Sequence, residues 1–234
     1  MGTVFSFDVR APGVETSAID AASDWLRWVD ETFSTYLPGS VISRLGRGEC
    51  ARGEYASEVD EVLARCRQLE AETDGYFSMY ASGRLDPSGL VKGWAIERAS
   101  DMLVAAGSVN HCVNGGGDVQ CAGGSAHGQA WRIGVAHPLR VREVAAVIVG
   151  NGLAVATSGS AERGAHVVDP HTGRAAGELA SITVTGRRLG DTDAYATAAF
   201  AMGQAARDWV EALDGHEAFA VRPDGSTWST TGWA

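Results

Sequence analysis

Length, composition and charge narrow the class of protein. The chain has 234 residues, of which 45% are hydrophobic and 21% are charged, and these values are typical of a globular protein that buries a full core. The formal charge of −10 at pH 7 argues against a general nucleic-acid-binding surface, so an anionic ligand would need a metal ion or a positioned cation.

Cysteine spacing and hydropathy indicate a cytoplasmic protein. Cys50, Cys66, Cys112 and Cys121 show no Cys-x-x-Cys spacing, and a chain of this size needs no disulfides, so we expect reduced thiols. No apolar run reaches the roughly 18 residues of a membrane span, and no charged-then-apolar leader opens the chain. No internal repeat or linker divides the sequence, so we expect one domain over residues 1–234.

The first part of the chain predicts one strand and two helices. Residues 5–9 alternate between apolar and polar, which is typical of a half-buried strand. Two segments with helical spacing of their apolar residues follow, one capped by Thr16 or Ser17 and the other beginning at Ser57. In the turn-rich loop between them, Tyr36 is either a packed aromatic residue or a stacking platform for a ligand.

A third predicted helix carries a lysine in its first turn. Asp86 or Ser88 can cap this helix, and Lys92 follows Gly89 by three residues. Free N–H groups at a helix N-terminus and a nearby ammonium group together favour an anion. The spacing is not that of a Walker A loop, and the alternative is a capped helix with a surface lysine.

The middle of the chain alternates short strands with glycine turns, which predicts an antiparallel sheet. The expected strands are His111–Asn114, Asp118–Cys121, Trp131–Ala136, Val144–Val149 and Leu153–Thr157. The turn from Asn114 to Asp118 contains three glycines but no helix follows it, so it fails the context test for a dinucleotide-binding loop. We instead expect a turn at which a ligand can lie against bare backbone.

Two histidines flank a short predicted strand that runs into a turn. His166 and His171 are candidates for acid–base chemistry or metal ligation, because imidazole titrates near neutral pH. Neither belongs to a His-x-x-His or Cys/His zinc pattern. A hydrogen-bonded structural role is the alternative for each.

The C-terminal part predicts a strand, an alanine-rich helix and a hairpin. The strand covers Ser181–Thr185, and the hairpin covers residues 218–230. The helix between them is capped by Asp191 or Thr192 and runs to about Leu213.

Within that helix, Asp193 and Thr197 are four residues apart and therefore lie on one face. A carboxylate and a hydroxyl are hard oxygen donors that suit Mg²⁺, which takes few protein carboxylates and completes its shell with water and phosphates. The alternative is that Asp193 is only a favourable charge near the helix N-terminus and Thr197 an ordinary surface residue.

Taken in order, these stretches resemble the ApbE family, the FAD:protein FMN transferases. The matching segments are Met1–Thr3, Ser34–Tyr36, Ser43–Leu45, Asp86–Gly93, Val113–Asp118, Trp131–Gly134, Thr157–Gly159, His166–Gly173 and Asp193–Thr197. The resemblance implies a mixed α+β fold, T-fold-like, with a largely antiparallel sheet and packed helices.

The resemblance also implies a reaction. Family members bind FAD and Mg²⁺, transfer FMN to a threonine hydroxyl of a partner flavoprotein as a phosphoester, and release AMP. The implied metal ligands here are Asp193, Thr197 and the main-chain carbonyl of Val91. His166 matches the histidine that takes the proton of the acceptor hydroxyl, and Lys92 falls near the pyrophosphate.

The other residues implied by the resemblance surround the FAD. They are Met1, Tyr36, Asn114 and Asp118 around the flavin and adenine, and Asp86 and Ser158 near the pyrophosphate. Two alternatives remain open, namely a Mg²⁺-dependent FAD pyrophosphatase that releases FMN and AMP, and an FAD-binding protein without catalysis.

Overall fold

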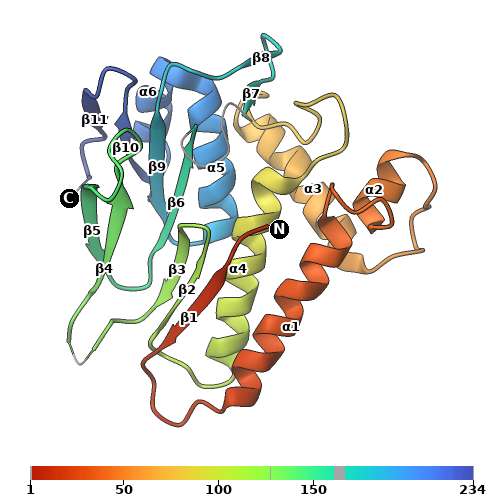
Figure 1. Ribbon diagram of the computed structural model, residues 1–234, viewed down its shortest axis with the longest axis horizontal. Coiled ribbons are helices and arrows are strands. Elements are labelled where there is room, and N and C mark those ends of the chain that lie inside the picture. The colour runs from red at the N-terminus through yellow and green to blue at the C-terminus, as the bar shows by residue number, and fades with distance from the viewer. Residues whose placement is uncertain (1, 127, 161–166, 234) are drawn as a thin grey trace.

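A seven-stranded antiparallel sheet forms the centre of the molecule (Figure 1). The computed structural model describes residues 2–126, 128–160 and 167–233. In spatial order the strands are β1 (Phe5–Val9), β2 (His111–Gly115), β3 (Asp118–Ala122), β6 (Ala154–Gly159), β9 (Ser181–Gly186), β10 (Glu217–Val221) and β11 (Thr227–Ser229). Each neighbouring pair is antiparallel, as predicted, but the expected strands over residues 131–136 and 144–149 do not join this sheet.

Two smaller antiparallel ribbons accompany this sheet. One consists of β4 (Trp131–Ala136) and β5 (Val144–Gly150), and the other of β7 (Val168–Asp169) and β8 (Arg174–Ala175). The first ribbon packs against the sheet through a small apolar core that includes Val119, Cys121 and Trp131. Because side chains alternate along a strand, Gln120 between Val119 and Cys121 points to the opposite face.

That opposite face is covered by helices, which enclose the main apolar core (Figure 1). The helices are α1 (Thr16–Phe33), α2 (Val41–Gly46), α3 (Ser57–Glu72), α4 (Ser88–Ala105), α5 (Leu189–Met202) and α6 (Ala206–Glu211). Helix α4 contacts β2 and β3, α5 contacts β6 and β9, and α1 packs on α4. Within the described residues, none of these helices has both the length and the apolar character needed to cross a membrane.

The predicted caps of two of these helices are only partly right. Helix α1 begins at Thr16, so this residue lies inside the helix and does not cap it. The cap position is held by Glu15, which makes no side-chain capping bond. Before α4, Pro87 holds the cap position without a side-chain capping bond, and Asp86 Oδ1 accepts the backbone N–H of Ser88 at 3.1 Å from one residue earlier. Helix α2 was not predicted, and its N-terminus is capped by Ser40.

Helix α5 begins before the predicted caps, so that assignment was wrong. It starts at Leu189, and Thr192 Oγ1 donates backwards to the Arg188 carbonyl at 2.7 Å. The Asp191 carboxylate lies 2.8 Å from Arg65 Nε of α3 and does not bind the backbone of α5. The Asp191 side chain is therefore held by a distant contact that the local sequence does not reveal, whereas Thr192 bonds back to its own helix.

The predicted single helix to Leu213 is divided in two. Gly203 has a φ of 61°, which few residues other than glycine adopt, and a short 3₁₀ turn over Gly203–Ala205 separates α5 from α6. A Cβ atom at Gly203 would lie 2.9 Å from the Glu178 Cβ. Glu178 also accepts the Gln204 N–H at 2.9 Å, so a distant carboxylate fixes the break.

Candidate active site

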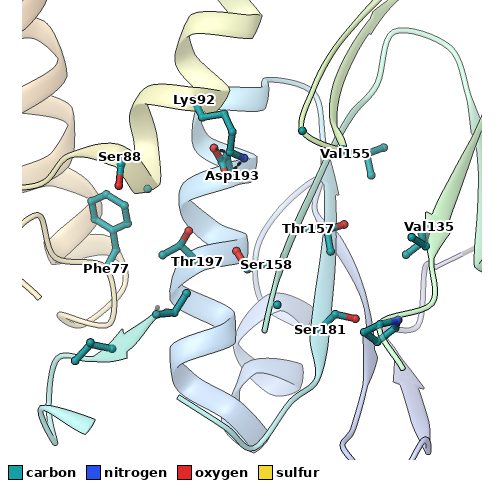
Figure 2. A pocket seen from close by; sticks show the side chains of 18 of the residues that line it. Phe77, Ser88, Lys92, Val135, Val155, Thr157, Ser158, Ser181, Asp193 and Thr197 are labelled. Carbon is teal, nitrogen blue, oxygen red and sulfur yellow. Dashed lines mark hydrogen bonds and ion pairs between the residues drawn. The ribbon is translucent and has the colours of Figure 1, made fainter. Parts of the chain in front are cut away.

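A cavity of about 350 Å³ opens where the start of α4 and the face of α5 approach strands β4 and β6 (Figure 2). Several of the residues predicted from the sequence line it together, namely Asp86, Lys92, Ser158, Asp193 and Thr197. These residues come from α4 and the loop before it, from β6 and from α5, so the fold assembles a site that no single motif contains.

Lys92 joins two buried carboxylates at one end of this cavity. Its ammonium lies 3.2 Å from Asp193 Oδ2 and also forms an ion pair with Asp118. The Asp118 side chain is 1% exposed and the Asp193 side chain 4%. Burying a carboxylate without a partner is costly, so one ammonium shared by two carboxylates holds all three groups in fixed positions.

Backbone N–H groups complete the support of both carboxylates. Gly93 donates to Asp193 Oδ2 at 2.9 Å, and Thr157 donates to Asp118 Oδ1, also at 2.9 Å. A charged acceptor makes such bonds stronger than neutral ones. The two carboxylates are thereby tied to α4 and to β6, respectively.

Two glycines of α4 allow α5 to come this close. A Cβ atom at Gly93 would lie 2.6 Å from the Asp193 Cβ, and one at Gly89 would lie 3.4 Å from Thr197 Cγ2. Gly89 and Gly93 are four residues apart, as are Asp193 and Thr197, so each glycine faces one of the two side chains predicted to bind a metal ion. Figure 2 shows Asp193 and Thr197 one turn apart on the same face of α5.

The N-terminus of α5 is anchored by side chains from other elements. Leu189 N–H donates to Gln120 Oε1 of β3, and Gly190 N–H donates to Glu97 Oε2 of α4, both at 2.9 Å. The first N–H groups of a helix lack partners inside it, so these bonds satisfy them and fix the axial position of α5. Burial raises the pKa of Glu97, while the bond from Gly190 opposes that shift.

The oxygen donors present fit a magnesium ion. Asp193 and Thr197 both face the cavity, and Mg²⁺ needs only one or two protein carboxylates. Val91 is buried beside Lys92 in α4, and its side chain is not among those that line the cavity. Among the described residues no group of three or more His, Cys, Asp or Glu side chains is placed to hold a metal ion. The expected ligands are of a different kind, because Asp193 is the single carboxylate among them and Thr197 and the Val91 carbonyl are the others.

The residues expected around the flavin are less concentrated. Asn114 does not line the cavity, but its Oδ1 accepts the Gly117 N–H at 3.2 Å and so shapes the turn whose Gly116 and Gly117 do. Tyr36 is 88% exposed and lies outside the cavity lining. Met1 and His166 lie outside the described residues, so their assigned roles stay predictions.

The sequence did not single out several residues that line the cavity. Phe77 and Tyr76 border it beside α4, and the edge of β4 contributes consecutive residues, Ile133–Ala136. Consecutive residues along a strand point to alternating faces, so a cavity that touches all of them contacts the strand's edge. The glycine at position 134 in this strand is the signal that was available, because it leaves the backbone bare.

Two further histidines have structural surroundings. His171 Nε2 lies 2.9 Å from the Asp74 carbonyl, and its ring centre is 4.4 Å from that of Tyr76, in accord with the structural alternative. His137 lines the cavity, with its Nδ1 3.1 Å from Leu139 N and its Nε2 3.0 Å from Arg140 Nε.

Comparison with known proteins gives a consistent result. A model of the ApbE family matches residues 1–83 and 80–220. A protein named FAD:protein FMN transferase from Vibrio cholerae is 32% identical over 181 residues, which cover 71% of this chain and 54% of that protein. A protein of the same name from Rhodobacter capsulatus is 33% identical over 159 residues, which cover 63% of this chain and 30% of that protein. The chain thus spans about half or less of the length of these relatives.

Solved structures share the fold over nearly the whole chain. The flavin transferase ApbE from Vibrio cholerae has a TM-score of 0.86 at 21% identity, covering 99% of this chain and 94% of that one. The ApbE protein from Thermotoga maritima has a TM-score of 0.87 at 22% identity, with 98% and 94% covered. These likenesses confirm the predicted mixed fold of helices and antiparallel sheet.

Proposed function

This chain belongs to the ApbE family, and on that premise we propose that it is a Mg²⁺-dependent FAD:protein FMN transferase. It takes FAD as substrate, attaches the FMN half through a phosphoester to a threonine of a partner flavoprotein, and releases AMP. The relatives that carry this name are longer than the chain, so the activity is proposed for this chain and not transferred from them.

One observation carries the proposal most directly. Asp193 and Thr197 face the same cavity as Lys92 and the start of α4, so oxygen donors for a cation lie beside groups that attract a phosphate. Attack of a hydroxyl on a phosphorus atom requires charge neutralisation and in-line placement of the nucleophile.

The chain's own groups divide this work. Asp193, Thr197 and the Val91 carbonyl would hold Mg²⁺, which when bound neutralises charge on the pyrophosphate. The start of α4 adds the positive end of its helix dipole at the same place, where the Lys92 ammonium is shared by Asp118 and Asp193. Asp118 keeps the Lys92 ammonium at the cavity end through their ion pair.

The flavin and the acceptor hydroxyl need separate accommodation. The bare backbone of Gly116 and Gly117 offers a flat surface inside the cavity for a ring system, and the buried Phe77 borders the cavity as part of the main core. The acceptor's hydroxyl proton requires a base, and we assign it to His166 from that residue's place in the family motif.

The test is a transfer assay with FAD, Mg²⁺ and a flavoprotein that bears a candidate acceptor threonine. Intact-mass measurement should show the acceptor gaining FMN, with AMP appearing in equal amount, and chelation of Mg²⁺ should abolish both. Free FMN and AMP without a modified acceptor would show a pyrophosphatase instead. Unchanged FAD in the presence of several acceptors would contradict catalysis altogether.

A further inference from the structure

The sheet carries a pair of cysteines that the proposed reaction does not use. Cys112 lies in β2 and Cys121 in β3, and they are direct partners in the antiparallel register. Cys121 is buried in the small apolar core beneath the β4–β5 ribbon, and half-buried Cys112 packs against the same core. Both thiols therefore lie on the face of the sheet opposite the helices.

The hydrogen-bond pattern puts this pair at the closer of the two kinds of cross-strand site. Directly opposed residues in antiparallel strands alternate between hydrogen-bonded pairs, with Cα atoms about 5.5 Å apart, and non-hydrogen-bonded pairs, at about 4.5 Å. The N–H of Cys121 donates at 2.8 Å to the carbonyl of Leu153, the residue just before β6, and so points away from β2. Cys112 and Cys121 therefore form a non-hydrogen-bonded pair, whose side chains approach each other.

The turn at the end of the hairpin independently identifies Cys112–Cys121 as a non-hydrogen-bonded pair. Gly115 and Asp118 flank a two-residue turn, and residues in that position form a hydrogen-bonded pair. The register then passes through Asn114–Val119 and Val113–Gln120 to Cys112–Cys121. Since the two kinds of pair alternate, the third step from the turn is non-hydrogen-bonded.

This geometry meets the requirements of a disulfide. A disulfide joins Cα atoms roughly 4.4–6.8 Å apart, and a non-hydrogen-bonded pair at about 4.5 Å falls inside that range. The two thiols are close enough to affect each other, and this interaction lowers the pKa of Cys112 and raises that of Cys121. Burial and the Asp8 carboxylate opposite Cys112 in β1 act against this lowering.

We propose that Cys112 and Cys121 are an oxidation site that closes to a cross-strand disulfide when the protein meets a small-molecule disulfide. The Cys112 thiolate attacks one sulfur of that molecule, displaces one thiol and forms a mixed disulfide. Cys121 attacks the Cys112 sulfur and displaces the second small-molecule thiolate, which takes up the Cys121 proton as it leaves. Two protein thiols are oxidised, and the small disulfide is reduced to two thiols.

The bond would act on the hairpin that serves the cavity. The same two strands end in the turn whose Gly116 and Gly117 line the cavity, and Asp118 at the start of β3 holds Lys92. A bond three pairs from the turn would limit fraying of the hairpin, because it joins the strands covalently. The other two cysteines lack such a partner, and burial raises the pKa of Cys66 to about 12.

The experiment incubates the reduced protein with oxidised glutathione, alkylates the remaining thiols and digests with a protease that cleaves before aspartate. Cleavage before Asp101, Asp118 and Asp169 separates the two cysteines into fragments 101–117 and 118–168. Mass spectrometry should find these fragments joined, and reduction should release them. No flavin, metal or acceptor is needed, so the result is independent of the proposed function.

Matched variants make the outcome specific. Cys112→Ser and Cys121→Ala should each abolish the joined fragments, whereas Cys50→Ser should retain them. Oxidation should raise the melting temperature of the wild type by about 5 °C or more and leave Cys112→Ser unchanged, as expected for a short closed loop. Full alkylation of both thiols, a persistent glutathione adduct on Cys112, or a link from Cys112 to Cys50 would each overturn the proposal.

Discussion

Gly93 of α4 donates its backbone N–H to Asp193 Oδ2 of α5 at 2.9 Å. The bond is possible only because position 93 has no side chain, since a Cβ atom there would lie 2.6 Å from the Asp193 Cβ. One glycine therefore supplies both the close approach of the two helices and a hydrogen bond to the carboxylate proposed as a metal ligand.

Replacing Gly93 by alanine should separate α4 from α5. The added methyl group overlaps Asp193 and the Leu189 carbonyl, so we expect a loss of about 1–3 kcal/mol of unfolding free energy, the usual scale of overpacking. Urea denaturation measures this loss. Gly190→Ala is the matched helical control, because its nearest neighbour is an ordinary 3.4 Å contact with the Trp94 Cα. Equal stability of the two variants would contradict the packing argument.

Removing the Lys92 ammonium should deprive the buried carboxylates of Asp118 and Asp193 of their shared ion-pair partner. Lys92→Met should therefore destabilise the fold by about 3 kcal/mol, the scale of a broken buried ion pair. Adding Asp118→Asn should recover part of this loss, because that change removes one uncompensated charge. Denaturation of both single variants and the double variant gives the coupling energy. Strict additivity would show that the Lys92–Asp118 pair does not act as a unit.

His111 should make stability depend on pH. Its ring nitrogens lie 2.8 and 2.9 Å from the hydroxyls of Ser100 and Ser108, and burial lowers its pKa. The unfolded chain then binds a proton that the folded chain does not, so stability is lost as pH falls from about 6.5 towards the lower folded pKa. The slope is at most about 1.4 kcal/mol per pH unit.

The His111 prediction is checked by measuring the free energy of unfolding at about pH 7.5, 6.5 and 5.5. These values span the ordinary histidine pKa of about 6.5. His111→Gln should flatten the wild-type dependence in this range, since its amide does not titrate. A variant with the same pH dependence as the wild type would assign the effect to other groups.

The sequence was informative where the signal is local. The alternation at residues 5–9, the helical spacing after Ser57 and the glycine turns of the middle region each placed an element correctly. Asp193 and Thr197 were placed on one helix face because a spacing of four residues determines that face. These relationships depend on neighbours in the chain.

The sequence was uninformative where distant segments meet. The break at Gly203 depends on Glu178, and the start of α5 depends on Gln120 of β3. The ion pair of Lys92 with Asp118 requires α4 to cross the sheet at the β2–β3 hairpin. No local pattern encodes such pairings, so the helix caps and the partners of Lys92 could not be predicted.

The most direct test compares FMN transfer by the wild type with transfer by two carboxylate variants of α5. Asp193→Asn removes the charge that faces the cavity, whereas Asp191→Asn removes one that pairs with Arg65. With FAD, Mg²⁺ and an acceptor flavoprotein, intact-mass measurement should show wild-type rates for Asp191→Asn. It should show a loss of about 10²-fold or more for Asp193→Asn, with the far-UV circular dichroism unchanged. Transfer by Asp193→Asn at the wild-type rate would contradict the assignment of this cavity as the catalytic centre.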